Sequence, residues 1–144
     1  MRLFRHLLRE HGYDPAVRDV AGVYQFYCGE SNAEARQHGG AYVFNYFGFF
    51  NDLRRRSTFQ SDAYQHHQPQ GTGQGYSKLT YEDLDERNMI MIGDPDKLIE
   101  RIRWAQNYFS TNYLIFEVAQ GGMPRQYIIP SLERFAKEVM PAFR

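Results

Sequence analysis

Residues 89–118, MIMIGDPDKLIERIRWAQNYFSTNYLIFEV, predict a strand, a helix and a second strand in immediate succession. The apolar residues 89–92 favour a short buried strand, and Asp94 and Pro95 are residue types that begin helices. Apolar side chains then recur at helical spacing, at Leu98, Ile102, Ala105 and Phe109. Because the next apolar segment follows at 113–118, this unit predicts parallel strands joined by a crossover helix.

The same alternation extends towards the N-terminus. Residues 19–28, DVAGVYQFYC, predict a strand that is covered on both faces, because apolar residues occur at both parities. Ser31 and Glu34 then form a capping-box pattern, which predicts a helix that is weakened by Gly39-Gly40. Residues 2–11 predict a further amphipathic helix.

The remaining segments separate these units. Residues 57–79 are rich in Gln and Gly, which predicts a flexible loop within a single domain that covers residues 1–144. Thr80 can cap a short helix over residues 81–87. Pro130 predicts that the last helix begins at about residue 130 and runs to about 140.

Composition excludes several classes of protein. The chain has 17 basic and 17 acidic residues, a balance that argues against binding nucleic acid by charge alone. It has a single cysteine, Cys28, so neither an internal disulfide nor a multi-cysteine zinc site is possible, and we expect no metal. No apolar run is long enough to cross a bilayer. We therefore expect a cytoplasmic protein that binds no membrane.

Three sets of motifs, taken in order, resemble the C-terminal end of bacterial luciferase-like, flavin-dependent monooxygenases. They are the strand that leads into Gly93-Asp94-Pro95, the strand that leads into GGMP at 121–124, and the terminal SLERFAKEVMP at 131–141. The earlier LLREHGYDP and the strand followed by SNAEAR are also similar to that family.

The resemblance implies the fold. It implies an α/β protein, specifically the C-terminal part of a (β/α)8 TIM-type barrel, with about three parallel strands and their crossover helices. Such barrels need about 250 residues, and this chain has 144. We therefore expect either a fragment that lacks its N-terminal portion or a reduced paralogue that completes its sheet as a homo-oligomer, because its strand edges would be open.

The resemblance also implies a flavin-dependent monooxygenase or oxidoreductase. The cofactor would be reduced FMN, or the deazaflavin F420, and the partners would be a small organic substrate and oxygen. In such barrels the site lies at the C-terminal ends of the strands. Expected cofactor-binding residues are Gly93, Gly121 and Gly122, and expected substrate-pocket residues are Tyr24, Phe26, Glu117 and Met123. No catalytic residue can be carried over.

Each of these residues also has a structural interpretation. The glycines suit turns, the rings of Tyr24 and Phe26 suit a core, and Glu117 could pair with an arginine across the sheet. Cys28 ends a strand at the same edge but is more typical of an inert buried thiol. The alternative function is a non-catalytic, truncated α/β module that associates through open sheet edges.

Overall fold

The computed structural model describes residues 2–56 and 79–143, so the predicted loop at 57–79 lies almost wholly outside the described residues. Its strands are β1 (Ala21–Cys28), β2 (Met91–Gly93) and β3 (Tyr113–Glu117). Its helices are α1 (Arg2–Glu10), α2 (Asn32–Ala35), α3 (Ala41–Arg56), α5 (Tyr81–Glu86), α6 (Pro95–Phe109) and α7 (Arg125–Arg134). Short 3-10 turns at Pro15–Val17, Gln120–Gly122 and Met140–Phe143 and π-helical segments at Arg36–Gly40 and Phe135–Val139 complete the chain.

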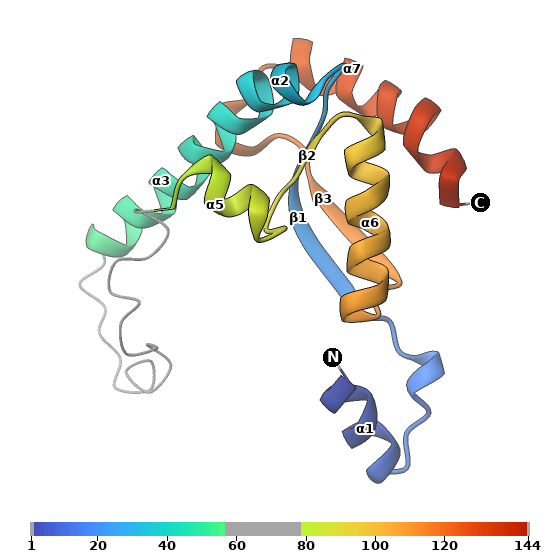
Figure 1. Ribbon diagram of the computed structural model, residues 1–144. Coiled ribbons are helices and arrows are strands. Elements are labelled where there is room, and N and C mark those ends of the chain that lie inside the picture. Colours follow the sequence, from blue (N-terminus) through green and yellow to red (C-terminus); the bar gives the residue numbers. More distant parts are fainter. Residues whose placement is uncertain (1, 57–78, 144) are drawn as a thin grey trace.

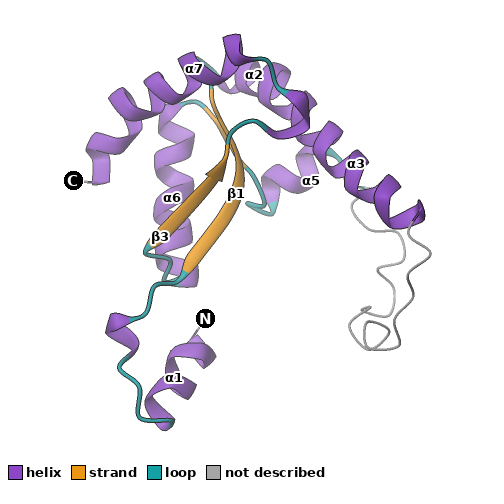
Figure 2. Cartoon of the chain, turned by 180° about the vertical axis from the view of Figure 1, so that it is seen from behind, coloured by secondary structure: helices purple, strands orange, loops and turns teal. Residues whose placement is uncertain are grey.

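The three strands form one parallel sheet in the order β2-β1-β3. The first half of β1 pairs with β3, for example Gln25 opposite Glu117, and its second half pairs with β2, for example Phe26 opposite Met91. In Figures 1 and 2 the strands rise towards α2 and α7, which lie at their carboxyl ends, whereas α1 lies beyond their amino ends. The predicted α/β class and parallel pairing are therefore confirmed.

Helices cover both faces of the sheet in the region where β1 pairs with β2. One core gathers side chains of β1, β2, α6 and the C-terminal π-helix, including Phe26, Leu98 and Val139. The second core lies on the other face and gathers side chains of β1, α2, α3 and α5, including Tyr27 and Leu84. The both-parity apolar pattern of residues 19–28 reflects this cover.

The strand order differs from that of a barrel arc. In a (β/α)8 barrel consecutive strands are neighbours and the helices form one outer ring, whereas here β1 lies between β2 and β3 and helices pack on both faces. Eight residues make β1 the longest strand, long enough for β2 and β3 to pair with different halves of it. The barrel part of the prediction is therefore not shown.

The last helix begins earlier than predicted. The chain is already helical at Arg125, and Pro130 lies inside α7. A proline there removes one backbone hydrogen bond, that from position 130 to the carbonyl of Gln126. The helix tolerates this loss because Tyr127 and Ile128 pack against the second core and Ser131 is buried. The prediction that Pro130 stops a helix is therefore wrong.

The glycine pair at 39–40 has a packing role. Both glycines are buried in the π-helical segment Arg36–Gly40, which joins α2 to α3. A Cβ at Gly39 would contact the Tyr27 side chain at 2.6 Å. Glycine therefore allows this turn to lie directly against β1, which offsets its low helix propensity.

Where β1 pairs with β3, one face of the sheet lacks a helical cover among the described residues. Val23 of β1 and Ile115 of β3 are 57 % and 43 % exposed, and Tyr113 beside them is also exposed. No helix in the described part of the chain is long and apolar enough to span a membrane.

Candidate functional site

The carboxyl end of β1 is tied to α7. The Cys28 amide donates to Ser131 Oγ at 2.7 Å, and Arg134 donates to the Cys28 carbonyl at 3.1 Å and to the Glu30 carboxylate at 2.8 Å. Ser131 and Arg134 lie three residues apart, on one side of α7. These contacts fix the position of α7 next to α2 (Figure 1).

A cluster of three polar side chains lies at this edge. Glu34 Oε1 accepts from the Tyr27 hydroxyl at 2.8 Å and lies 2.6 Å from His38 Nδ1, while Glu34 Oε2 accepts from the Glu30 amide at 3.0 Å. The Ser31 hydroxyl accepts from the Glu34 amide, so half of the predicted capping box is confirmed. The Glu34 carboxylate reaches the Glu30 amide instead of the Ser31 amide that the capping box predicts. Three contacts fix its orientation.

Burial and charge act on Tyr27 in the same direction. Burial, followed by the hydrogen bond to Glu34, raises the pKa of the Tyr27 hydroxyl well above its ordinary value. Tyr27 therefore remains a protonated donor to Glu34 at any physiological pH.

The His38 ring connects this cluster to α7. It lies 4.4 Å, centroid to centroid, from the ring of Tyr127, in the first turn of α7. The Gly121–Gly122 turn comes just before that helix. The site therefore joins the π-helical segment after α2 to the segment after β3, two regions about 90 residues apart in sequence.

Sequence reasoning identified Glu34 only as a capping residue and missed Tyr27 and His38. The available signal was a Glu–His pair at i, i+4 in a helix that begins directly after a strand. The π-helical turn at Arg36–Gly40 could not be predicted from the sequence, because it depends on tertiary packing against Tyr27.

The three predicted cofactor glycines lie in different surroundings. Gly93 is buried at the end of β2, where a Cβ would contact Lys97 and Asn32. Gly121 has a positive φ of 62°, and a Cβ there would collide with the Tyr42 carbonyl of α3. Gly122, with φ of 78°, has open space around its missing side chain. Of these three glycines, Gly122 alone has free space where a side chain would lie.

The predicted pocket residues are not brought together. Tyr24 and Phe26 lie in the first core, where the Phe26 ring, 1 % exposed, stacks on Phe116 at 4.6 Å. Met123 is buried in the second core. Glu117 accepts from Gln25 Nε2 at 2.6 Å, so its partner across the sheet is a glutamine instead of an arginine.

Glu117 also acts on a residue of α3. Burial, followed by the Glu117 carboxylate, raises the pKa of the Tyr46 hydroxyl. Glu117 therefore belongs to a polar group that includes Gln25 and Tyr46, on the sheet face that carries Val23 and Ile115.

Two buried groups at the carboxyl edge differ in their hydrogen bonding. Burial raises the pKa of the Cys28 thiol to about 12, so it remains protonated and unreactive at neutral pH. Gln120 is also buried and donates from Nε2 to the Phe26 carbonyl, but its Oε1 has no partner among the described residues. An unsatisfied buried acceptor calls for a donor from elsewhere.

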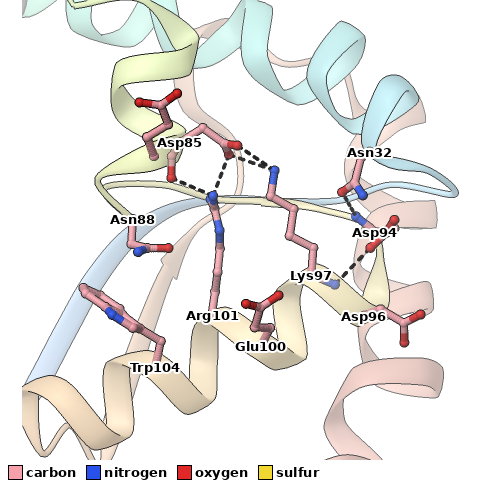
Figure 3. A pocket seen from close by; sticks show the side chains of 10 residues that line it. Asn32, Asp85, Asn88, Asp94, Asp96, Lys97, Glu100, Arg101 and Trp104 are labelled. Atoms are coloured by element: carbon pink, nitrogen blue, oxygen red, sulfur yellow. Dashed lines mark hydrogen bonds and ion pairs between the residues drawn. The ribbon is translucent and has the colours of Figure 1, made fainter.

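A cleft of about 530 Å³ lies between α5 and α6. Figure 3 shows Asp94 and Asp96 at one end, Trp104 at the other, and Asp85 turned towards Lys97 and Arg101. The residues that line it are Asn32, Asp85, Glu86, Asn88, Asp94, Asp96, Lys97, Glu100, Arg101 and Trp104. Five carboxylates against two cations make this lining net negative, which disfavours a phosphate ligand.

The two cations in the cleft are already paired. Lys97 Nζ binds the Asp85 carboxylate at 2.8 Å, and Arg101 binds the same carboxylate at 2.8 Å. Arg101 is 7 % exposed and also donates to the carbonyls of Ile90 and Asp85. This network joins α5, β2 and α6, so it has a structural role. The described residues contain no cluster of three or more His, Cys, Asp or Glu that could hold a metal ion.

Comparison with known proteins finds similarity to solved structures. No family model matches the chain, and no curated protein matches it. The fold is similar to the crystal structure of monooxygenase RslO1 from Streptomyces bottropensis, with a TM-score of 0.67 and 20 % sequence identity. The alignment covers 99 % of this chain and 36 % of that chain, so this chain spans about a third of its length. At this identity the likeness shows the fold alone.

Proposed function

We propose that this chain is the C-terminal portion of a luciferase-like, flavin-dependent monooxygenase. The observation that carries the proposal is the likeness to a monooxygenase fold over 99 % of the chain. The luciferase-like motifs at 93–95, 121–124 and 131–141 agree with it. The chain spans about a third of that neighbour. We therefore propose that the monooxygenase activity requires a larger protein or assembly that includes this chain.

The carboxyl edge fits parts of a flavin. The open space at Gly122 and the first turn of α7, which has no acidic residue and begins with Arg125, suit a phosphate group. The unpartnered Gln120 Oε1 suits a hydroxyl or ring N–H donor, and both occur in flavins. The cleft between α5 and α6 fits less well because its lining is net negative.

The proposal assigns separate roles to the flavin and to the residues of this chain. A bound reduced flavin would supply the electrons for oxygen activation and transfer to an organic substrate. The residues of this chain would hold the phosphate at Gly122 and α7, and would accept one polar donor at Gln120. FMN is the first candidate and F420 the alternative.

Flavin titration tests this proposal. Purified chain would be titrated with FMN and, in parallel, with F420, alone and joined to any N-terminal sequence that its reading frame encodes. We expect saturable quenching of flavin fluorescence. Gly122→Ala should weaken it, whereas Gly48→Ala, also at a glycine with open surroundings, should leave it unchanged. Absence of binding in both forms would defeat the proposal.

A second candidate function is supported by the exposed sheet face. Val23, Tyr113 and Ile115 form an apolar surface that a partner or a second copy could cover. The chain would then be a non-catalytic module that associates through this sheet. Sedimentation at several concentrations tests the alternative, and a monomer at every concentration would contradict it.

A further inference from the structure

We propose that His38 Nε2 is the proton-accepting atom of the carboxyl-edge site, and that Glu34 is the positioning residue that fixes the neutral ring in its Nδ1–H tautomer. This inference deepens the proposed function by naming the acid–base group that the bound ligand would meet. The ligand is one that carries an O–H or N–H group, which it turns towards Nε2.

The first step of the argument is the direction of the Glu34–His38 hydrogen bond. An ionised carboxylate can only accept, so the 2.6 Å contact requires a proton on His38 Nδ1. In the neutral ring the lone pair then lies on Nε2. Among the described residues Nε2 has no hydrogen-bond partner, and the side chain is 28 % exposed.

The second step is that Glu34 is itself held in place. The Tyr27 hydroxyl donates to Oε1 at 2.8 Å and the Glu30 amide donates to Oε2 at 3.0 Å. A base whose second ring nitrogen is held by an oriented carboxylate is the arrangement that acid–base and nucleophilic enzymes use. The titratable groups packed around the His38 ring are Glu34, Tyr27 on β1 and Tyr127 on α7.

The third step is the location of His38. It lies in a π-helical turn, a distortion that is frequent at functional sites, and at the carboxyl end of a parallel sheet, where ligands of open α/β folds bind. These two observations are independent of the hydrogen-bond geometry.

The proposed step is a proton transfer. The O–H or N–H bond of the ligand breaks, its electron pair stays on the ligand atom, and a new N–H bond forms at Nε2. The positive charge of the resulting imidazolium lies beside the Glu34 carboxylate, which stabilises it. The proton then returns to solvent or to the product.

Nitrogen-15 NMR of histidine-labelled chain tests the assignment without flavin. We expect the neutral His38 ring to carry its proton on Nδ1 and to leave Nε2 unprotonated. Glu34→Leu should convert the ring largely to the Nε2–H tautomer. Glu34→Gln, which keeps a carbonyl acceptor, should preserve the Nδ1–H form, as should Tyr27→Phe. An Nε2–H tautomer in the wild-type chain would overturn the proposal.

Acylation by diethyl pyrocarbonate, mapped by mass spectrometry, tests whether Nε2 can be reached. We expect His38 to react in the folded chain, and to react more slowly in Glu34→Leu, with the exposed His6 as internal reference. A native His38 that stays unmodified while His6 reacts would overturn the proposal. Because neither measurement uses flavin, failure of flavin binding remains a separate result.

Discussion

The cleft between α5 and α6 and the carboxyl edge of β1 each contain a charged network, yet the two differ in what they leave unpaired. In the cleft, Asp85 is paired with Lys97 and Arg101, and Arg101 also satisfies two backbone carbonyls. At the carboxyl edge, Glu34 holds Tyr27 and His38, while His38 Nε2 and Gln120 Oε1 have no partner among the described residues.

This difference distinguishes polar groups that stabilise the fold from polar groups that are available to a ligand. A network whose members are all paired inside the protein joins secondary-structure elements and offers a ligand only groups that are already occupied. A network that orients one group and leaves its other atom free is prepared for a partner from outside. A cleft lined by charged residues therefore need not be the functional site, and we expect substitutions in the two regions to affect different properties.

Arg101→Met should cause the largest loss of stability. The substitution leaves Asp85 with one cation and the carbonyl of Ile90 without its donor, and removing one partner of a buried ion pair costs about 3–5 kcal/mol. Urea denaturation measures the change. Lys97→Met is the control, because Lys97 is more exposed and its ammonium binds, among the described residues, the Asp85 carboxylate alone, so the substitution should cost about 1 kcal/mol or less. Equal losses would contradict a structural role for Arg101.

Gly121→Ala should destabilise the chain by about 3 kcal/mol, because it adds a collision with the Tyr42 carbonyl to the strain of a positive φ. Gly122→Ala carries the backbone strain alone and should cost only about 1–2 kcal/mol. The comparison, made by thermal and urea unfolding, distinguishes a packing glycine from one beside open space. A larger loss for Gly122→Ala would reverse that distinction.

Thr80→Ala should cost about 1 kcal/mol, because Thr80 caps α5, the helix that carries Asp85. The backbone amide of Thr80, followed by its hydroxyl, lowers the pKa of Asp83. A depressed carboxyl pKa stabilises the fold above the unfolded value of about 3.8 and loses that contribution as pH falls below it. Acid unfolding of Thr80→Ala should therefore show a weaker dependence on pH, and an unchanged dependence would contradict the capping box.

Cys28 should have the smallest effect at neutral pH. Its pKa of about 12 predicts that iodoacetamide alkylates the native chain far more slowly than the unfolded chain at pH 8. Because the folded pKa is raised, the stabilising contribution is present below the ordinary value of 9.0 and is lost as pH rises towards 12. Cys28→Ala should lack this alkaline loss. Rapid alkylation of native Cys28 would place a reactive thiol at the carboxyl edge.

Local signals were sufficient for most of the elements. The Asp94–Pro95 start predicted α6, and Asp94 does accept from the Lys97 amide. The apolar segments at 19–28, 89–92 and 113–118 predicted the three strands to within about two residues. Pro130 wrongly predicted the start of the last helix, because packing against the cores outweighs one lost hydrogen bond. The strand order depends on long-range pairing, for which a single sequence carries no local signal.

The candidate site was harder to predict than the fold. Gly121 and Gly122 have the same residue type, and only tertiary contacts distinguish the packed one from the open one. Successive side chains of β1 point to opposite faces of the sheet, so Tyr24 and Phe26 lie in one core and Tyr27 lies in the other. The sequence of the strand does not show which helices cover each face. Glu34 and His38 form a Glu–His pair at i, i+4 in the sequence, but the position of His38 depends on a helical distortion that packs against β1.

The most direct test of the central claim is an amide chemical-shift map recorded while isotope-labelled chain is titrated with FMN. We predict that the shifts of Gly122, Tyr127 and His38 change together and saturate, while those of Lys97 and Trp104 in the cleft stay constant. Changes centred on the cleft, or no saturable change at the carboxyl edge, would contradict the account.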